Sequence, residues 1–146
     1  MSTIPSMAPG EIRTAVPDDL SDIHDIHVQA FGGRQDEANL VDLLHAAKKA
    51  EPSLVAACEG KIVAHVIFSP MSIDPARQDF KVAGLGPVGV LPAYQRRGIG
   101  SQLIRAGIAA SRQAGLDAVA VLGSPKFYTR FGFRPAMNYG LTNEYV

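Results

Sequence analysis

Tryptophan is absent from this sequence, cysteine occurs once, and acidic and basic side chains balance at 14 each. A single cysteine cannot form an internal disulfide or a cysteine-rich zinc cluster, and this usage is typical of a reducing cytoplasm. Cys58 stands in the apolar run LVAAC, so we expect it in the core. Because the net charge is zero, no overall field favours nucleic acid or an anionic membrane surface. Neither partner is expected, and any anion site must be local.

Long hydrophobic runs are also absent. The longest, such as LVAAC and AVAVL, are far shorter than the roughly 20 residues that cross a bilayer. Residues 1–10 (MSTIPSMAPG) have neither a basic start nor an apolar centre, which predicts a flexible tail rather than a secretory signal. A cytoplasmic location is therefore expected. With 146 residues, 47% hydrophobic and 19% charged, the chain predicts a single globular domain over 11–146.

The order of predicted elements indicates an α/β class with a mixed sheet covered by helices. A short strand at 11–17 precedes two helices, one beginning at Pro17 and ending at Gly32, the other over 34–50. In the second helix an apolar stripe is formed by Leu40, Leu44 and Ala47. Two strands over 53–73 joined at Glu59-Gly60, a strand at 79–92, a helix over 101–114 and a strand at 116–123 follow, and 126–136 predicts a short helix leading into a last strand.

The strand at 79–92 is dense in residues that disturb a sheet. Gly84, Gly86, Pro87 and Gly89 all fall inside it. Proline donates no ladder hydrogen bond and glycine has no side chain to pack, so a bulge or a splayed edge is expected. A plain edge strand blunted by Pro87 is the alternative.

The loop QRRGIG, over 95–100, separates this strand from the following helix. The first-turn N–H groups of a helix that starts near Gly98 have no intrahelical partners and lie at the positive end of the helix dipole. Gly98 and Gly100 would let a phosphate approach the backbone, and Arg96 and Arg97 add local positive charge. The spacing alone leaves open that the glycines only turn the chain. It matches neither the Walker pattern nor the dinucleotide fingerprint, since Leu103 stands where the latter needs a glycine.

The stretch VGVLPAYQRRGIGSQLI resembles the cofactor-binding motif of the GNAT superfamily of N-acetyltransferases, and FYTRFGF resembles its C-terminal signature. The resemblance covers about 11–136 and implies a GNAT-like fold with splayed strands. It further implies acetyl-CoA as cosubstrate, no metal, and transfer of an acetyl group to a primary amine of a small molecule or peptide. Its cofactor-binding positions correspond here to Val88, Val90, Arg96, Arg97, Gly98, Ile99, Gly100 and Ser101. A homodimer paired through an edge strand is compatible with this fold.

In this superfamily the amine attacks the thioester directly, and a tyrosine protonates the departing thiolate. The matching residue is Tyr128, and a phenol with a pKa near 10 can protonate a thiolate whose acid has a pKa of about 8.5. Phe127 and Phe131, four residues apart, are expected to form the buried stripe that leaves Tyr128 free. A tyrosine at the core edge with its hydroxyl in water is the alternative.

The acceptor amine must also lose a proton, and keeping a lysine-like amine neutral at pH 7 costs roughly 4.6 kcal/mol. Many superfamily members carry a carboxylate base in the strand, whereas GLGPVGV has none. Glu37 or His65 could act through water, or each could have only a structural role. A non-catalytic CoA-binding or regulatory module with the same fold is therefore the alternative function. His24 and His27, three residues apart, are expected on a solvated face rather than as a metal pair.

Overall fold

The computed structural model describes residues 11–71, 81–121 and 131. The expected tail at 1–10 and the expected helix and strand over 126–136, Phe131 excepted, lie outside this part of the chain. The elements are β1 (Glu11–Thr14), α1 (Leu20–Ala30), α2 (Asp36–Ala46), β2 (Ser53–Cys58), β3 (Lys61–Met71), β4 (Val82–Val90), α3 (Ile99–Gln113) and β5 (Ala118–Val121). The predicted order of elements is confirmed over the described residues.

The five described strands form one mixed sheet in the order β1-β2-β3-β4-β5. The first four pair antiparallel, and β5 pairs parallel with β4. Parallel neighbours need a crossover, which α3 supplies. The turn between β2 and β3 lies at the predicted dipeptide, where Glu59 and Gly60 both have positive φ, 52° and 83°. Two such residues make the tight turn that matches strand twist.

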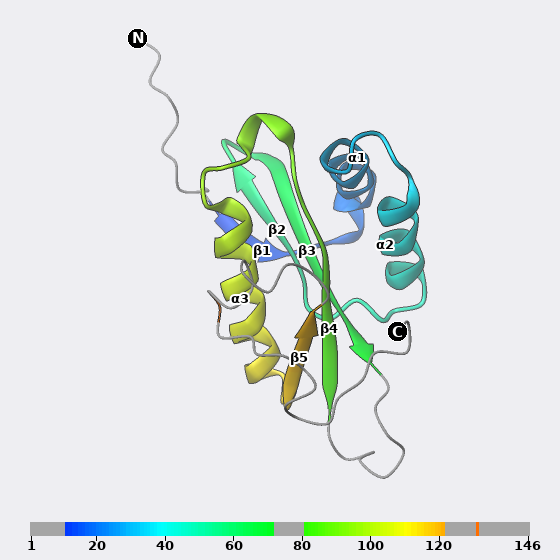
Figure 1. The fold of residues 1–146 in the computed structure, drawn as a ribbon, viewed down its shortest axis with the longest axis vertical. Coiled ribbons are helices and arrows are strands. Elements are labelled where there is room, and N and C mark those ends of the chain that lie inside the picture. Colours follow the sequence, from blue (N-terminus) through cyan, green and yellow to red (C-terminus); the bar gives the residue numbers. More distant parts are fainter. Residues whose placement is uncertain (1–10, 72–80, 122–130, 132–146) are drawn as a thin grey trace.

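Helices cover both faces of the sheet (Figure 1). On one face α3 packs on β2, β3 and β4, and on the other α1 packs on β3 and β4 with α2 beside it. The central strand β3 therefore lies between two helical layers, and its residues Ile62 to Phe68, like Leu54 to Ala57 of β2, are each at most 7% exposed. The sequence predicted alternation along these strands. Burial of both faces explains instead why they read as nearly continuous apolar runs.

The packing of α3 depends on a close approach at Gly107. An added Cβ at this position would lie 2.2 Å from Cε1 of Phe68 on β3. The helix thus presents a glycine where the aromatic ring meets its backbone, with Leu103 and Ile104 buried beside it. Within the described residues, no helix is long and apolar enough to span a membrane.

Side-chain burial differs from the sequence-based expectation in α2 and at Cys58. In α2 the buried residues are Ala38 and Val41, whereas Leu40 is 46% exposed. Ala47 is exposed as well, and of the expected stripe only Leu44 packs against the core, because α2 packs on α1 through a different side of the helix. Cys58 is half-buried and packs against the core from the end of β2, as a free thiol.

An ion pair fixes the junction between β1 and α1. The Arg13 guanidinium donates to both carboxylate oxygens of Asp19, at 2.7 and 3.0 Å, and the Val16 N–H donates to the same carboxylate at 2.8 Å. The bonds from Arg13 are the main reason that the pKa of the buried Asp19 lies below its usual value.

Candidate active site

The expected irregularity of β4 is a bulge at its middle. Val88 pairs with Val66 and Leu85 with Phe68, so one residue of β3 faces both Gly86 and Pro87. On its other edge β4 pairs with β5 only over Val82–Leu85. From Gly86 to Val90 that edge has no strand partner among the described residues. The half of β4 beyond the bulge thus has backbone groups available to a ligand on the β5 side.

The loop before α3 leads into the helix through a left-handed glycine. Gly98 is the N-cap of α3 with a φ of 81°, a left-handed conformation that favours glycine. The first bond of the helix runs from the Gln102 N–H to the Gly98 carbonyl at 3.0 Å, so three N–H groups precede it. Those N–H groups belong to Ile99, Gly100 and Ser101. They lie at the positive end of α3, as the sequence predicted.

The structure brings this loop against the far half of β4. An added Cβ at Gly100 would lie 3.5 Å from Cγ2 of Val90 and 4.0 Å from Cγ1 of Val88. The Gln95 side-chain amide donates to the Val90 carbonyl at 2.9 Å and ties the loop to the strand. Val88 and Val90 on β4 and Gly100 at the start of α3, which the sequence places in separate elements, are therefore neighbours in the structure.

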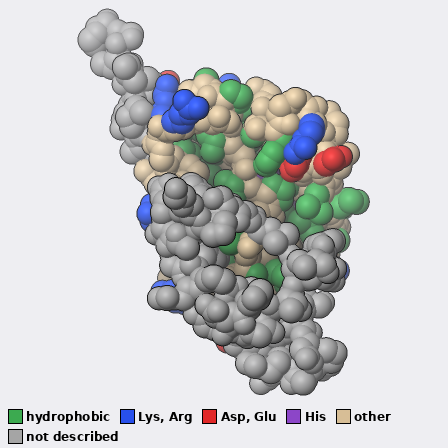
Figure 2. Space-filling model, viewed as in Figure 1, with side chains coloured by type: hydrophobic (Ala, Val, Ile, Leu, Met, Phe, Trp, Pro, Cys, Tyr) green, Lys and Arg blue, Asp and Glu red, His purple; other side chains and the backbone are tan. Residues whose placement is uncertain are grey.

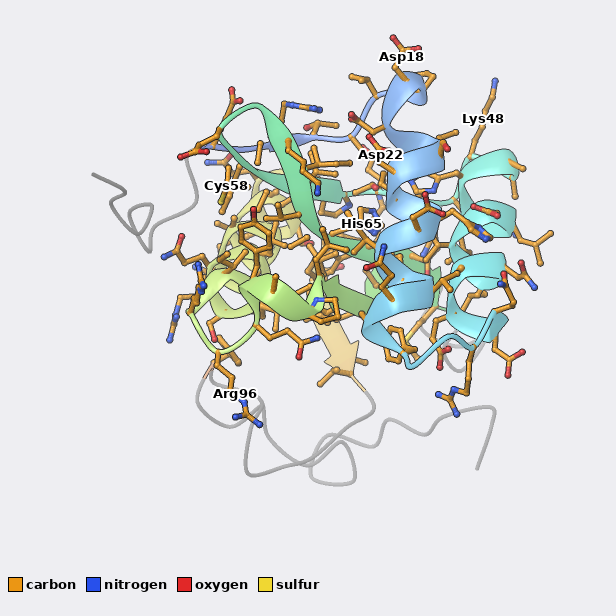
Figure 3. The ribbon with its side chains drawn as sticks, turned by 90° about the horizontal axis from the view of Figure 1, so that it is seen from above. Asp18, Asp22, Lys48, Cys58, His65 and Arg96 are labelled. Carbon is orange, nitrogen blue, oxygen red and sulfur yellow. The ribbon has the colours of Figure 1, made fainter. Side chains whose placement is uncertain are left out.

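Positive charge gathers at the same corner of the molecule. Arg96 projects from the loop away from the sheet (Figure 3), with a positive φ of 65°. The Arg97 guanidinium lies 5.6 Å from the centre of the Tyr94 ring. Figure 2 shows Lys and Arg side chains at the corner where Figure 1 places the loop before α3. A neutral protein thus has a locally cationic rim beside the helix terminus.

The family model for the acetyltransferase (GNAT) domain matches residues 11–136 of this chain. The chain belongs to the GNAT acetyltransferase family. It is 40% identical over 119 residues to the uncharacterized N-acetyltransferase YjhQ of Escherichia coli strain K12, covering 80% of this chain and 65% of YjhQ. The chain therefore spans slightly less than two thirds of the length of that relative.

Two solved GNAT structures are similar to this fold. A GNAT family acetyltransferase from Brucella melitensis, in complex with acetyl-CoA, matches with a TM-score of 0.80 and 42% identity over 86% of this chain and 82% of that one. The N-acetyltransferase YhbS from Escherichia coli, in complex with CoA, matches with a TM-score of 0.83 and 31% identity over 95% of this chain and 76% of that one. The predicted family and the GNAT-like fold are confirmed.

The candidates for proton transfer in this GNAT domain have different surroundings. Tyr128 lies outside the described residues, whereas Phe131 is half-buried and packs against the core. The Glu37 carboxylate, at the start of α2, accepts from Arg34 at 2.9 Å through one oxygen. Its other oxygen is buried and has no hydrogen-bond partner among the described residues. Glu37 thus stays a candidate, held in place by an ion pair.

The expected solvated face is wrong for one of the two histidines of α1. His24 is half-buried and contacts Asp42 and Gln35 through its two ring nitrogens. His27 is fully buried, and its Nε2 lies 2.8 Å from Nδ1 of His65. Three residues at about 100° each leave the two side chains about 60° apart around α1, so His27 lies in the core and His24 at its edge.

A chain of hydrogen bonds continues from His65, which Figure 3 places between the sheet and α1. His65 Nε2 lies 2.8 Å from Ser53 Oγ, and Ser53 Oγ lies 2.9 Å from His45 Nε2. Both nitrogens of His65 are thus occupied. Burial lowers the pKa of His65 well below its usual value and that of His27 to about 4. The sequence could not predict this cluster, because its members come from α1, α2, β2 and β3.

No group of three metal-binding side chains is present within 11–71, 81–121 and 131. His45, His65 and His27 are linked in a line through hydrogen bonds rather than around a common point. The cluster is therefore a hydrogen-bonded chain.

Proposed function

We propose that this protein transfers the acetyl group of acetyl-CoA to a primary amine by direct attack of the amine on the thioester. The observation that carries the proposal is the contact between the N-terminus of α3 and the half of β4 that has no partner on its β5 side among the described residues, where Gly100 meets Val88 and Val90. Family membership and the ligands of the two similar solved structures support it. The acceptor class is a small-molecule or peptide amine.

The residues at the helix terminus fit a diphosphate. Three backbone N–H groups without a partner among the described residues and the dipole of α3 favour negative charge, and Gly98 and Gly100 leave the backbone uncovered. Arg96 and Arg97 add charge at the rim. On the β5 side of β4 the Val90 carbonyl already accepts from Gln95. The rest of that backbone edge at Val88 and Val90 has no strand partner among the described residues and is suited to hydrogen-bond an amide-containing arm. Acetyl-CoA supplies an activated thioester, and these residues orient it.

In this proposal Tyr128 donates a proton to the sulfur as the C–S bond breaks. The Tyr128→Phe variant should lower kcat at least tenfold and leave the Kd for CoA within twofold, because only the proton donor is removed. The Kd is measured by calorimetry and kcat by thiol release. Unchanged kcat would remove Tyr128 from the mechanism.

The phosphate assignment has a matched control at the other end of α3. Gly98 and Gly115 flank the helix with φ of 81° and 88°, and neither has an atom within 4 Å of an added Cβ. Aspartate at either position strains the backbone similarly, but only Gly98→Asp places a negative charge beside the proposed diphosphate. We expect Gly98→Asp to weaken CoA binding at least tenfold and Gly115→Asp to leave it unchanged. Equal affinity in both variants would contradict the assignment.

The decisive test is thiol release from acetyl-CoA in the presence of a panel of amines: an aminoglycoside, a polyamine, an amino acid and a lysine-containing peptide. An acetyltransferase releases one thiol for each acetylated amine. A non-catalytic CoA-binding module would gain thermal stability with CoA but release no thiol with any amine in the panel. A chain that is not stabilised by CoA would contradict both functions.

A further inference from the structure

The hydrogen-bonded chain from α2 to α1 has a defined direction. His45 Nδ1 lies 3.0 Å from the Val41 carbonyl, which can only accept, so Nδ1 carries a hydrogen. In neutral His45 the other nitrogen then accepts from the Ser53 hydroxyl. Ser53 Oγ in turn accepts from His65 Nε2–H, and His65 Nδ1 accepts from His27 Nε2–H. The network therefore assigns a lone pair to Nδ1 of His27.

That lone pair is buried and has no partner. His27 Nδ1 has no hydrogen bond among the described residues, and the side chain is 0% exposed. An added Cβ at Gly89 would lie 2.8 Å from this nitrogen. Because position 89 is glycine, no side chain separates His27 Nδ1 from the β4 backbone between Val88 and Val90. An unused acceptor lies directly against the strand proposed to hold the pantetheine arm.

The other end of the chain faces an open space. His45 is half-buried, and His45 and Ser53 line a cavity of about 340 Å³ together with residues from β1, α3 and the segment before β2. Thr14 and Glu51 also line this mainly apolar cavity, and water beside them can solvate a charge that the core cannot. The four side chains therefore connect a buried acceptor to a site where positive charge is tolerated.

The same four side chains remain hydrogen-bonded to one another after one proton is added at His27 Nδ1. A proton on His27 Nδ1 lets His27 Nε2–H pass to His65 Nδ1, His65 Nε2–H to Ser53 Oγ, and the Ser53 hydroxyl proton to His45 Nε2. Every inner bond is then satisfied in the opposite direction at unchanged distances of 2.8 to 2.9 Å. The added charge ends on His45, whose Nδ1–H still donates to the Val41 carbonyl.

We propose that this histidine relay, His27–His65–Ser53–His45, takes up the proton that the acceptor amine loses during acetyl transfer. The proposal rests on the proposed function. The amine nitrogen bonds to the acetyl carbon, the C–S electron pair goes to sulfur, and the amine proton goes to His27 Nδ1 while the charge moves to His45. When the proton later leaves His27 Nδ1 by the side from which it came, the three inner transfers reverse. His27, His65 and Ser53 then return to their starting tautomers.

The charges around the relay agree with this direction. His24 and Asp42 influence His27 from α1 and α2, and Asp19 faces His65 from the start of α1. Burial disfavours an imidazolium at both inner rings. A proton taken up by the relay is therefore disfavoured on His27 and on His65.

Two variants interrupt the relay without touching the proposed cofactor site. His45→Gln keeps an oxygen that accepts from Ser53 but cannot take up a proton. Ser53→Ala removes the bridging hydroxyl, and Ser53→Thr keeps it. Ser111→Ala is the matched control, because its hydroxyl is also buried but lies on α3, outside the relay, without a hydrogen-bond partner among the described residues. Circular dichroism and thermal melting verify that each variant is folded.

The readout is kcat at saturating acetyl-CoA, measured by thiol release with the amine that the wild-type chain acetylates fastest in the panel. We expect His45→Gln and Ser53→Ala to lower kcat at least tenfold, with the KM for acetyl-CoA within twofold. Ser53→Thr should recover most of the activity and Ser111→Ala should match the wild type. A purely structural role for position 45 would be served by glutamine.

Folded His45→Gln and Ser53→Ala variants with kcat within twofold of the wild type would overturn the relay and leave the proposed function intact. A loss confined to the KM for acetyl-CoA would also overturn it, because it would assign the residues to shaping β4. A wild-type chain that releases no thiol with any amine would overturn the proposed function and the relay together.

Discussion

Acid should destabilise this fold through its buried histidines, and His27 gives the clearest case. The folded protein keeps His27 neutral, with a pKa lowered by burial from 6.5 to about 4. The unfolded chain exposes the ring, which protonates near 6.5. Between these two values the unfolded state binds the extra proton, so the free energy of unfolding falls as the pH is lowered. The stabilisation is complete above pH 6.5 and is lost as the pH falls towards 4.

The magnitude follows from the size of the shift. A lowering by about 2.5 units corresponds to roughly 3 kcal/mol at about 1.4 kcal/mol per unit. Between pH 8 and pH 5, where the folded ring is still mostly neutral, about 2 kcal/mol of this should be lost. Burial also lowers the pKa of His65, which adds a loss of the same sign.

Urea unfolding followed by circular dichroism at pH 8, 7, 6 and 5 measures this effect. Carboxylates titrate in the same range, so the comparison is between the wild type and His27→Gln. The variant should be less stable at pH 8 and should lose about 2 kcal/mol less than the wild type between pH 8 and 5. A His27→Gln variant as acid-sensitive as the wild type would refute the argument.

Two further predictions concern packing and the β1–α1 junction. Gly107→Ala should lower the free energy of unfolding by about 1–3 kcal/mol in urea denaturation, because its Cβ meets the Phe68 ring and the strain exceeds the gain in helix propensity. Adding Phe68→Leu should recover part of this loss. Additive losses in the double variant would contradict the clash. Asp19→Ala should lower the free energy of unfolding by about 1–2 kcal/mol, because Arg13 and a backbone N–H lose their acceptor. The control Asp18→Ala, at an exposed position, should leave it unchanged. Equal urea midpoints for both variants would show that the ion pair contributes nothing measurable.

Local sterics made several features predictable. The hairpin at Glu59 and Gly60 and the start of α3 at Gly98 depend on a positive φ, which few residues adopt easily. The bulge beside Pro87 follows from a residue that cannot donate a ladder hydrogen bond. These constraints act within a few residues, so a single sequence contains them.

Side-chain neighbours across the fold were less predictable. Apolar spacing in α2 selected Leu40, which is exposed, because which side of a helix is buried depends on the helix it meets. His27 was expected in solvent for the same reason. Its helical position was correct, but the register of α1 against β4 decides that it enters the core opposite Gly89.

The sequence by itself determined the order of elements, the glycine turn before α3 and the disturbed strand beside it, since each depends on the conformational limits of adjacent residues. Only the tertiary structure decided that Gly100 meets Val88 and Val90, and that three histidines and a serine form one hydrogen-bonded chain. Those contacts join residues far apart in the chain. They exist because sheet register and helix packing bring side chains from four elements within about 3 Å of one another.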